Sequence, residues 1–361
     1  MKTPNEGYGI PRGEGGDPPE RVAAVVVAFQ AGEHLDRAVA ALRAQTLPPA
    51  RVIVVDNGST DGSVDGLEER HPGVEVLRLG RNAGFAAANN AGVALADDCD
   101  WAALVNPDAF PEPDWLERLL AAARERPEFS FFGGRLVQAL APELLDGAGD
   151  AYHVSGMAWR REHGRPVTVD AGGRREVFSP CAAAALYRRD AWDEAGGFDE
   201  RWFAYYEDND LAFRLRLLGH RCLYVPDAVT RHVGSAIAGV DSPFTVYHAH
   251  RNLIWTYVKD MPAPLLWLYL PQHLLVNVLA LGWYAARGRL GAVLRGQRDA
   301  ILGLGPVLRS RREVQARRRV GALEVRRPMA KGIAAYAESL GRARLSLARA
   351  RAQSARAASD Q

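Results

Sequence analysis

Buried strands alternating with helices constrain the fold of this chain more than any other feature of its sequence. Residues 22–29, VAAVVVAF, form a nearly unbroken apolar run, which is typical of a strand covered on both faces of a sheet. Residues 51–56, RVIVVD, repeat the pattern and end in an acid. Between them Leu35, Val39 and Leu42 recur at helical spacing. Weaker copies of this alternation follow, so the sequence predicts a mostly parallel, doubly wound α/β sheet.

The alternation becomes irregular after residue 130. Residues 133–178 combine many glycines and charges with few periodic runs, which indicates short strands and loops. A strand and a short helix are expected in residues 181–198, an amphipathic helix in 211–220, and a further strand in 221–225. This second half returns to the same α/β pattern.

The two ends of the chain differ from its body in composition. Residues 1–20 are rich in Gly, Pro and charge, lack the apolar stretch of a signal peptide, and are expected to be a disordered tail. From Arg309 onward 14 Lys and Arg face 4 Asp and Glu, so the +2 of the whole chain divides into +10 there and −8 in residues 1–308. Three separated cysteines, in no metal-ligand spacing, favour a reducing compartment.

Residues 263–286 are apolar and long enough to cross a bilayer, which takes about 20 residues per span. Pro271, Gln272, His273 and Asn277 interrupt the run. Three interpretations remain: a buried helical pair in a C-terminal subdomain, a helix lying in the membrane interface with aromatic residues near the headgroups, or a true span.

The basic tail favours contact with an anionic membrane surface, because each Lys or Arg near such a surface contributes about 1 kcal/mol. A solvated charged helix or a nucleic-acid-binding tail is the competing interpretation. We expect a cytoplasmic protein, peripheral at the inner face of the cell membrane, without a nucleic-acid partner. Residues 251–308 would form its apolar helical region and 309–361 its basic helical tail.

Two polar groups directly follow predicted strands. Asp56 and Asn57 begin a turn-rich loop after the second strand, and Asn106-Pro107-Asp108 follows the apolar run WAALV. Ligands bind beyond the carboxyl ends of strands in such sheets, so these side chains can meet a nucleobase, a ribose or a phosphate-bound metal. A loop-forming turn for the first group, and a helix cap for the second, are the structural alternatives.

Two further groups come later in the chain. Glu207, Asp208 and Asp210 stand at the start of a predicted helix, where acids either complement the helix dipole or include a general base for an acceptor hydroxyl. His232 follows the last predicted strand, where it is either a structural histidine or a nitrogen ligand to the metal held by Asp108.

The sequence lacks the usual phosphate-binding and nucleophile motifs. It has no G-x-x-x-x-G-K-[ST] loop, no G-x-G-x-x-G after the first strand and no G-x-S-x-G. A divalent metal, Mn²⁺ or Mg²⁺, would therefore have to neutralise the charge of a bound diphosphate.

Four segments in this order carry a family resemblance: VVVAFQAGEHLDRAVAALRAQTLPPARVIVVDNGSTDGS, RNAGFAAANNAGVALA, NPDA and GGFDERWFAYYEDNDLAFRLRLLGHRCLYVPDAVTRHVGS. They span about residues 21–235 and resemble the family 2 glycosyltransferases with a GT-A fold, nearest their rhamnosyltransferase-like branch. The resemblance implies a GT-A domain over residues 21–250 and an inverting transfer.

The resemblance also implies roles for individual residues. Asn106-Pro107-Asp108 looks like the family's DXD element, with Asp108 as the metal ligand and His232 as the second protein ligand. Asp208 would be the base, beside Glu207. The residues implied to bind the nucleotide sugar are Phe29, Asp56, Asn57, Asn82, Asn90 and Asn106.

Two departures from the family pattern bear on nucleotide preference. Phe29-Gln30 stands where many relatives carry Tyr-Asn, and Ala86-Ala87-Ala88 replaces a run that is commonly rich in Gly.

The function implied is transfer of a deoxyhexose such as rhamnose from a dTDP- or UDP-sugar to a lipid-linked or cell-surface glycan, in cell-wall or polysaccharide biosynthesis. Transfer of another hexose or of galactofuranose is the close alternative. A nucleotidyltransferase would normally show a basic Gly-rich phosphate loop near the first strand, which is absent. A binding protein that kept the fold without catalysis is disfavoured because Asp108 and Asp208 are both present.

Overall fold

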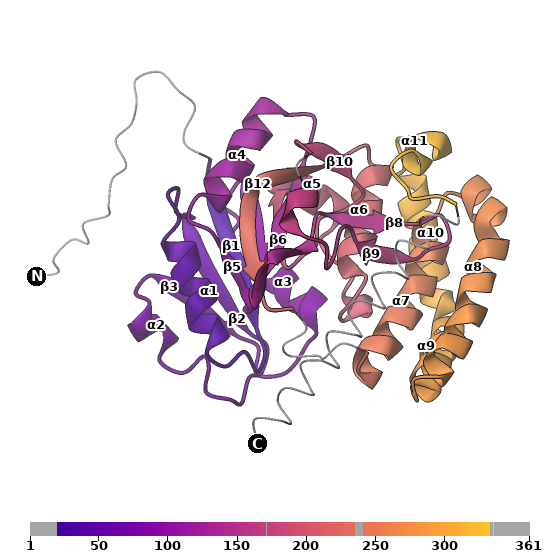
Figure 1. The fold of residues 1–361 in the computed structure, drawn as a ribbon, viewed down its shortest axis with the longest axis horizontal. Helices are drawn as coiled ribbons and strands as arrows, with labels where there is room; N and C mark the ends of the chain where they lie inside the picture. The colour runs from indigo at the N-terminus through magenta and orange to yellow at the C-terminus, as the bar shows by residue number, and fades with distance from the viewer. Residues whose placement is uncertain (1–19, 171, 235–240, 333–334, 336–361) are drawn as a thin grey trace, which may run out of the picture.

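The computed structural model describes residues 20–170, 172–234, 241–332 and 335. Figure 1 shows a sheet with helices on both faces, and a group of C-terminal helices at one side of it. The expected N-terminal tail, apart from Glu20, and the last part of the basic tail, residues 336–361, lie outside the described residues.

Within the described residues, ten strands form one mixed sheet in the order β10-β12-β6-β11-β4-β1-β2-β3, with β5 paired to β12 and β7 to β6. The four strands from β4 to β3 are parallel, as the sequence predicts. β11 runs antiparallel to both of its neighbours, and β12 is again parallel to β6. The strands are β1 (Val22–Ala28), β2 (Arg51–Asp56), β3 (Val74–Arg78), β4 (Trp101–Val105), β5 (Ala109–Pro111), β6 (Phe131–Gln138), β7 (Ala141–Gly147), β10 (Arg175–Val177), β11 (Ala184–Arg188) and β12 (Cys222–His232). A separate pair consists of β8 (Asp150–Tyr152) and β9 (Ala158–Arg160).

Strand β1 is buried along its whole length and supplies both faces of the sheet. Its even-numbered residues join one apolar core with α1 and α4, and its odd-numbered residues join a second core with α3 and α6. At Gly92 in α3 a Cβ would lie 2.5 Å from Val25 Cγ1, so glycine allows this helix to approach the sheet closely. The helices of this part are α1 (His34–Arg43), α2 (Leu67–Arg70), α3 (Phe85–Ala94), α4 (Trp115–Glu125), α5 (Arg189–Ala195) and α6 (Glu207–Leu217), with 3₁₀ turns at Val167–Val169 and Glu200–Trp202.

Strand β12 is longer than the expected strand over residues 221–225. Its register with β6 shifts between Val225 and Val229, and pairing then resumes as far as His232. The polar and proline residues of this bulge end the apolar pattern in the sequence, although the strand continues. His232 pairs with Ala109 of β5, which places it beside the segment that follows β4.

The C-terminal helices pack against one another at one side of the sheet, as Figure 1 shows. The expected boundaries at residues 250/251 and 308/309 fall inside α7 and α10, and these two helices are in contact. The helices are α7 (Pro243–Asp260), α8 (Ala263–Ala285), α9 (Leu290–Leu302), α10 (Leu304–Ala316) and α11 (Ala322–Arg326).

Helix α8 is a single helix that continues through Pro271, so residues 263–286 do not form a buried helical pair. Among the described residues it is the one helix long and apolar enough to cross a membrane by length and composition. Only Leu265, Tyr269 and His273 of its 23 residues are buried. The large apolar side chains of α8 that are more than half exposed are Trp267, Leu268, Leu274, Leu275, Val278 and Leu279.

Candidate active site

A cavity of ≈ 820 Å³ lies where β1 and β4 end, and the start of α6 and the start of α7 complete its wall. This is the sheet edge at which α/β proteins bind ligands. Eight of the ten site residues predicted from the sequence line this cavity: Phe29, Asn57, Asn82, Asn106, Asp108, Glu207, Asp208 and His232. The structure therefore brings together side chains that are up to 203 positions apart in the chain.

Asp56 and Asn90 are the two predicted residues that do not line the cavity. The Asp56 carboxylate accepts a hydrogen bond from the Ser59 N–H at 2.8 Å and so shapes its own loop. The Asn90 side chain accepts from the Phe198 N–H at 2.8 Å and donates to the Phe198 carbonyl at 2.9 Å. Both side chains hold backbone in place beside the site.

The wall at the β2 and β4 ends is built from amides. Asn57 donates to Asn82 Oδ1 at 3.0 Å and accepts from the Ala83 N–H at 2.8 Å, which fixes both asparagines. Asn106 Oδ1 is buried and has no hydrogen-bond partner among the described residues. A buried polar atom in this state is normally satisfied by a ligand or water, so this oxygen marks a place where a polar ligand fits.

Asp108 and His232 meet inside the cavity, with Nε2 of the histidine 3.3 Å from Oδ1 of the aspartate. Two adjacent ligands of one Mn²⁺ or Mg²⁺ ion lie about 3 Å apart, because each metal–oxygen or metal–nitrogen bond is about 2.1 Å. The other ring nitrogen, Nδ1, lies 2.7 Å from Asp146 Oδ2, and Arg160 holds Asp146 in turn at 2.5 Å. A histidine ligand oriented by a carboxylate is the usual arrangement around protein-bound metals, so the pair fits a divalent cation.

Without a metal, the electrostatic balance of this group favours its charged forms, and a cation that binds at Asp108 and His232 would displace the Nε2 proton of His232. Burial by itself raises the pKa of Asp146, but Arg160 and His232 outweigh it and hold that pKa well below its usual range. Burial raises the pKa of Asp108 as well, and His232 more than offsets this effect, so that pKa is lowered. Burial lowers the pKa of His232, whereas Asp146 and Asp108 raise it, with a result of about 9.

Asp208 is the second residue of α6 and lines the same cavity. Its Oδ1 accepts the Asn209 N–H at 2.7 Å, and its Oδ2 lies 3.4 Å from the Ala182 nitrogen. Burial raises the pKa of Asp208, and burial together with the Asp208 charge raises the pKa of Glu207 well above its usual value. A carboxylate with a raised pKa is a better proton acceptor near neutral pH, which is the property that a general base needs.

The segment directly before these acids is strained. Phe203, Tyr205 and Tyr206 have φ values of 63°, 67° and 70°, a region that side chains other than glycine rarely occupy. Each such residue costs on the order of 1–3 kcal/mol and persists only where the surroundings fix it. The start of α6 is therefore held in an arrangement that the local sequence does not favour.

Asn252 of α7 supplies much of that constraint. Its side-chain nitrogen lies 2.9 Å from the carbonyl oxygens of Trp202 and Ala204 and 2.6 Å from that of Tyr205, and the residue is fully buried. Arg251 adds a hydrogen bond to the Trp202 carbonyl at 3.0 Å. The C-terminal helical region thus fixes the backbone that carries Glu207 and Asp208.

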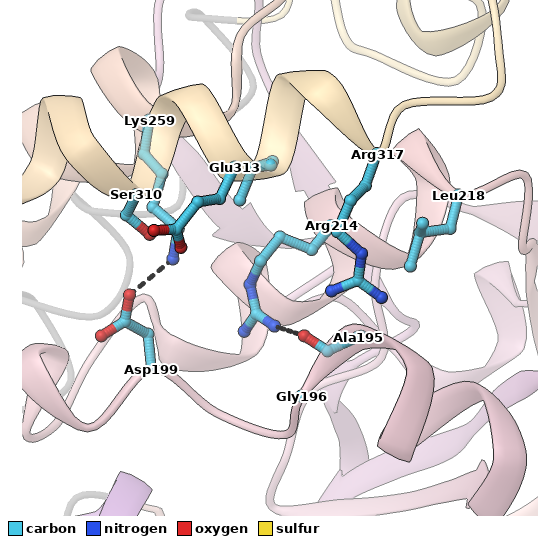
Figure 2. Close-up of a pocket in the computed structure, with 10 residues that line it drawn as sticks. Ala195, Gly196, Asp199, Arg214, Leu218, Lys259, Ser310, Glu313 and Arg317 are labelled. Carbon is cyan, nitrogen blue, oxygen red and sulfur yellow. Dashed lines mark hydrogen bonds and ion pairs between the residues drawn. The ribbon is translucent and has the colours of Figure 1, made fainter.

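A network of buried charges joins α6 to α7 a short way from the cavity. Figure 2 shows it around a smaller pocket of ≈ 190 Å³, with Lys259 directed at Asp199 and Arg214 at the Ala195 carbonyl. Lys259 Nζ lies 2.7 Å from both Asp199 and Asp210, and Arg214 lies 2.7 Å from Asp210. Removing one partner from a buried pair typically costs about 3–5 kcal/mol, so this network locks the two helices together.

Several residues of the site could not be found from the sequence pattern. Asp146, Asp150 and Arg160 lie in the irregular part of the chain, and Asn252 lies in a helix far from every motif. A run of acid and glycine, DGAGD, was the visible signal around Asp146 and Asp150, but nothing in it pointed to His232.

Comparison with known proteins gives a consistent result. The family model described as glycosyl transferase family 2 matches residues 23–195. N-acetylglucosaminyl-diphospho-decaprenol L-rhamnosyltransferase of Mycobacterium tuberculosis is 33% identical over 290 residues, which cover 70% of this chain and 92% of that protein. O-antigen biosynthesis protein RfbC of Myxococcus xanthus is 30% identical over 230 residues, 60% of this chain and 18% of that protein.

Among solved structures, that of GalNAc-T7 with UDP, GalNAc and Mn²⁺ resembles this one with a TM-score of 0.55. The two sequences are 15% identical, and the match covers 68% of this chain and 48% of the other. This likeness concerns the fold alone, and it agrees with the GT-A architecture expected from the sequence.

Proposed function

The chain belongs to glycosyltransferase family 2, and from that premise we propose that it transfers a deoxyhexose such as rhamnose from a nucleotide diphosphate donor to a lipid-linked glycan. The family and the GT-A fold make it a glycosyltransferase that uses a nucleotide sugar. The name of the mycobacterial relative supports the sugar and the lipid-linked acceptor. The observation that carries the proposal is the single cavity that holds Asp108, His232 and Asp208 together.

In the proposed reaction Asp208 accepts the proton of an acceptor hydroxyl. The oxygen of that hydroxyl then bonds to the anomeric carbon of the donor sugar, while the bond from that carbon to the diphosphate breaks. One displacement of this kind inverts the anomeric configuration and needs no protein nucleophile. The half-buried position of Asp208 in the cavity and its raised pKa suit it to this role.

The donor side is assigned to the amide-lined wall. Asn57, Asn82 and the unpartnered Asn106 oxygen would contact the nucleotide and phosphate groups, and Phe29 offers an apolar surface to the base. Asp108 and His232 would hold Mn²⁺ or Mg²⁺, which when bound offsets the charge of the departing diphosphate.

We place the enzyme at the inner face of the cell membrane, in contact with anionic lipid. The exposed apolar side of α8 supports this location, since a continuous apolar surface on a protein normally meets a membrane or a partner. Exposed arginines lie on α9, which packs against α8, and on α10, which packs against α9; they include Arg295, Arg309 and Arg312. A lipid-linked acceptor would then reach the cavity from the membrane to which the enzyme is bound.

A panel of nucleotide sugars tests the proposal directly. We expect dTDP-rhamnose or another deoxyhexose donor to raise the melting temperature of the full chain in the presence of Mn²⁺ or Mg²⁺, because a ligand that binds only the folded state stabilises it. The same donor should label a polyprenyl-diphosphate-linked acceptor with inversion at the anomeric carbon. If only a hexose or galactofuranose donor supports transfer, the proposed donor sugar is wrong and the proposed mechanism still stands. Failure of every donor to bind or transfer would contradict the proposal.

A further inference from the structure

Three metal-binding side chains meet in the cavity at a place separate from Asp108 and His232. They are Asp150 from β8, Cys181 from the segment before β11 and Asp208 from α6, and one ligand atom of each lies within 4.8 Å of the other two. No motif in the sequence predicts this cluster, because the three residues come from three different parts of the chain.

Backbone hydrogen bonds fix the cluster from two sides. The Asp150 N–H donates to the Ser179 carbonyl at 2.8 Å, and the Ala182 N–H lies 3.4 Å from Asp208 Oδ2. The short segment that carries Cys181 is therefore tied to the backbone of Asp150 and to the carboxylate of Asp208. The thiol is free of any disulfide.

Asp150 gives an independent sign that a ligand fits here. The residue is only 6% exposed, it lines the cavity, and its Oδ1 has no hydrogen-bond partner among the described residues. Leaving a buried carboxyl oxygen without a partner is costly, on the order of 1–3 kcal/mol or more. A cation beside this oxygen would remove that cost.

We propose that Asp150, Cys181 and Asp208 form a second metal site, selective for a thiophilic divalent cation such as Zn²⁺, and that its occupation inhibits the enzyme. Zinc binds thiolate sulfur at about 2.3 Å and carboxylate oxygen at about 2.0–2.2 Å, which puts tetrahedral ligand atoms about 3.3–3.7 Å apart. Small side-chain movements close the present separation of up to 4.8 Å to that range.

The ligand types separate this site from the one at Asp108 and His232. Thiolate sulfur favours Zn²⁺ and Cd²⁺ strongly, whereas Mg²⁺ and Mn²⁺ prefer oxygen and imidazole ligands. Excess Mg²⁺ or Mn²⁺ would therefore occupy the site at Asp108 and His232, and zinc would still bind the site at Cys181. Inhibition follows because a metal bound to Asp208 occupies the oxygen that must accept the acceptor proton; this part of the inference rests on the proposed function.

Binding must release to solvent the thiol proton of Cys181 and, below about pH 8, the carboxyl proton of Asp150, since the metal ligands are the thiolate and the carboxylate. Burial raises the pKa of that thiol and, with the Asp208 charge, raises the pKa of Asp150 to about 8. The affinity for zinc is therefore expected to rise with pH.

The test is a titration of the full chain with Cd²⁺ or Co²⁺ in the presence of excess Mg²⁺ and without any substrate. We expect a sulfur-to-metal absorption band that saturates at one equivalent, and inhibition of sugar transfer by Zn²⁺ over the same range. Cys181→Ala should abolish the band. It should also raise the Zn²⁺ concentration that halves the rate by about tenfold or more, with the rate of each variant expressed as a fraction of its own rate without Zn²⁺. Asp150→Asn should keep the band and weaken its affinity.

Cys99→Ala is the matched control, because Cys99 is another free thiol but is buried in the core between α3 and the sheet. It should keep both the band and the inhibition. Absence of the band in the unaltered chain, or its survival in Cys181→Ala, would overturn the inference. A band without any sugar transfer would leave the metal site standing and count against the proposed function instead.

Discussion

The sheet and the C-terminal helices bury their side chains in opposite ways. All seven residues of β1 are buried, whereas only three of the 23 residues of α8 are. The protein itself covers β1 with helices on both faces, but it leaves the apolar outer side of α8 uncovered. This contrast fits the proposed division of roles, in which the edge of the sheet carries out the chemistry and α8 attaches the enzyme to the membrane.

The sharpest way to break that division is to remove the proposed base. We expect Asp208→Asn to lower kcat by roughly 10²–10⁴-fold, because the amide keeps the shape of the carboxylate but cannot accept a proton. Donor-induced thermal stabilisation and binding to anionic vesicles should both persist. Turnover close to that of the unaltered enzyme would remove Asp208 from the mechanism.

A smaller effect is expected at Asp146, which contacts His232 without lining the cavity. Asp146→Asn should raise the Mn²⁺ concentration needed for half-maximal activity by about 10–100-fold, since partners of a metal ligand typically contribute that much to affinity. Excess Mn²⁺ should restore most of the rate, which a merely unfolded variant would not show. An unchanged metal requirement would mean that Asp146 does not orient His232.

The helical side of the comparison is tested by substituting exposed leucines of α8. Leu275→Gln with Leu279→Gln should weaken binding to anionic vesicles roughly tenfold to a hundredfold, because each leucine loses part of the 1.5–3 kcal/mol that full burial would contribute. Transfer to a water-soluble acceptor analogue should stay within about twofold. The matched control is Leu95→Gln with Leu140→Gln, which alters exposed leucines of the sheet region. Equal loss of vesicle binding in both double variants would refute the role of α8.

The last prediction concerns the stability of the helical region, on which mild acid acts. Burial lowers the pKa of His248, His250 and His273 to about 4. Between pH 4 and pH 6.5 the unfolded chain therefore binds more protons at these positions than the folded chain does. Stability should fall as pH falls through that window, by up to about 1.4 kcal/mol per pH unit for each histidine.

Hydrogen exchange measured at pH 6.5 and pH 4.5 would check this prediction by region. Helices α7 and α8, which carry the three histidines, should lose protection before β1 and β2 do. Earlier loss in the sheet would show that the histidines do not control acid sensitivity.

The part of the molecule that the sequence predicts best is the part where one periodic pattern decides the structure. The strands predicted over residues 22–29 and 51–56 match β1 and β2 to within one residue, whereas the sequence pattern did not predict α2 or β5. The bulge after Val225 shows the limit of the method, because the strand continues where the apolar pattern stops. Pairing with β5 and β6 decides that continuation, and pairing partners cannot be read from a local pattern.

The same limit applies to the site. The sequence motifs predicted Asp108, Asp208 and His232 as site residues, and the structure brings these three into one cavity. Asn90 matched the motif equally well, yet its amide is engaged by the backbone of Phe198. Asp146 and Asn252 went unnoticed because their importance depends on which side chains they meet after folding. The role of Asp146 in supporting the pair Asp108 and His232 is a prediction that the Asp146→Asn variant tests.

The strained turn before α6 affects when the enzyme becomes active during its synthesis. During translation Asp208 is synthesised before Asn252, whose side chain donates hydrogen bonds from α7 to the carbonyls of the turn. A nascent chain that ends before Asn252 thus already contains Asp108, Asp208 and His232. It still lacks the side chain that fixes the backbone carrying Asp208. Sugar transfer is therefore expected only after α7 has been synthesised and Asn252 has bound the turn.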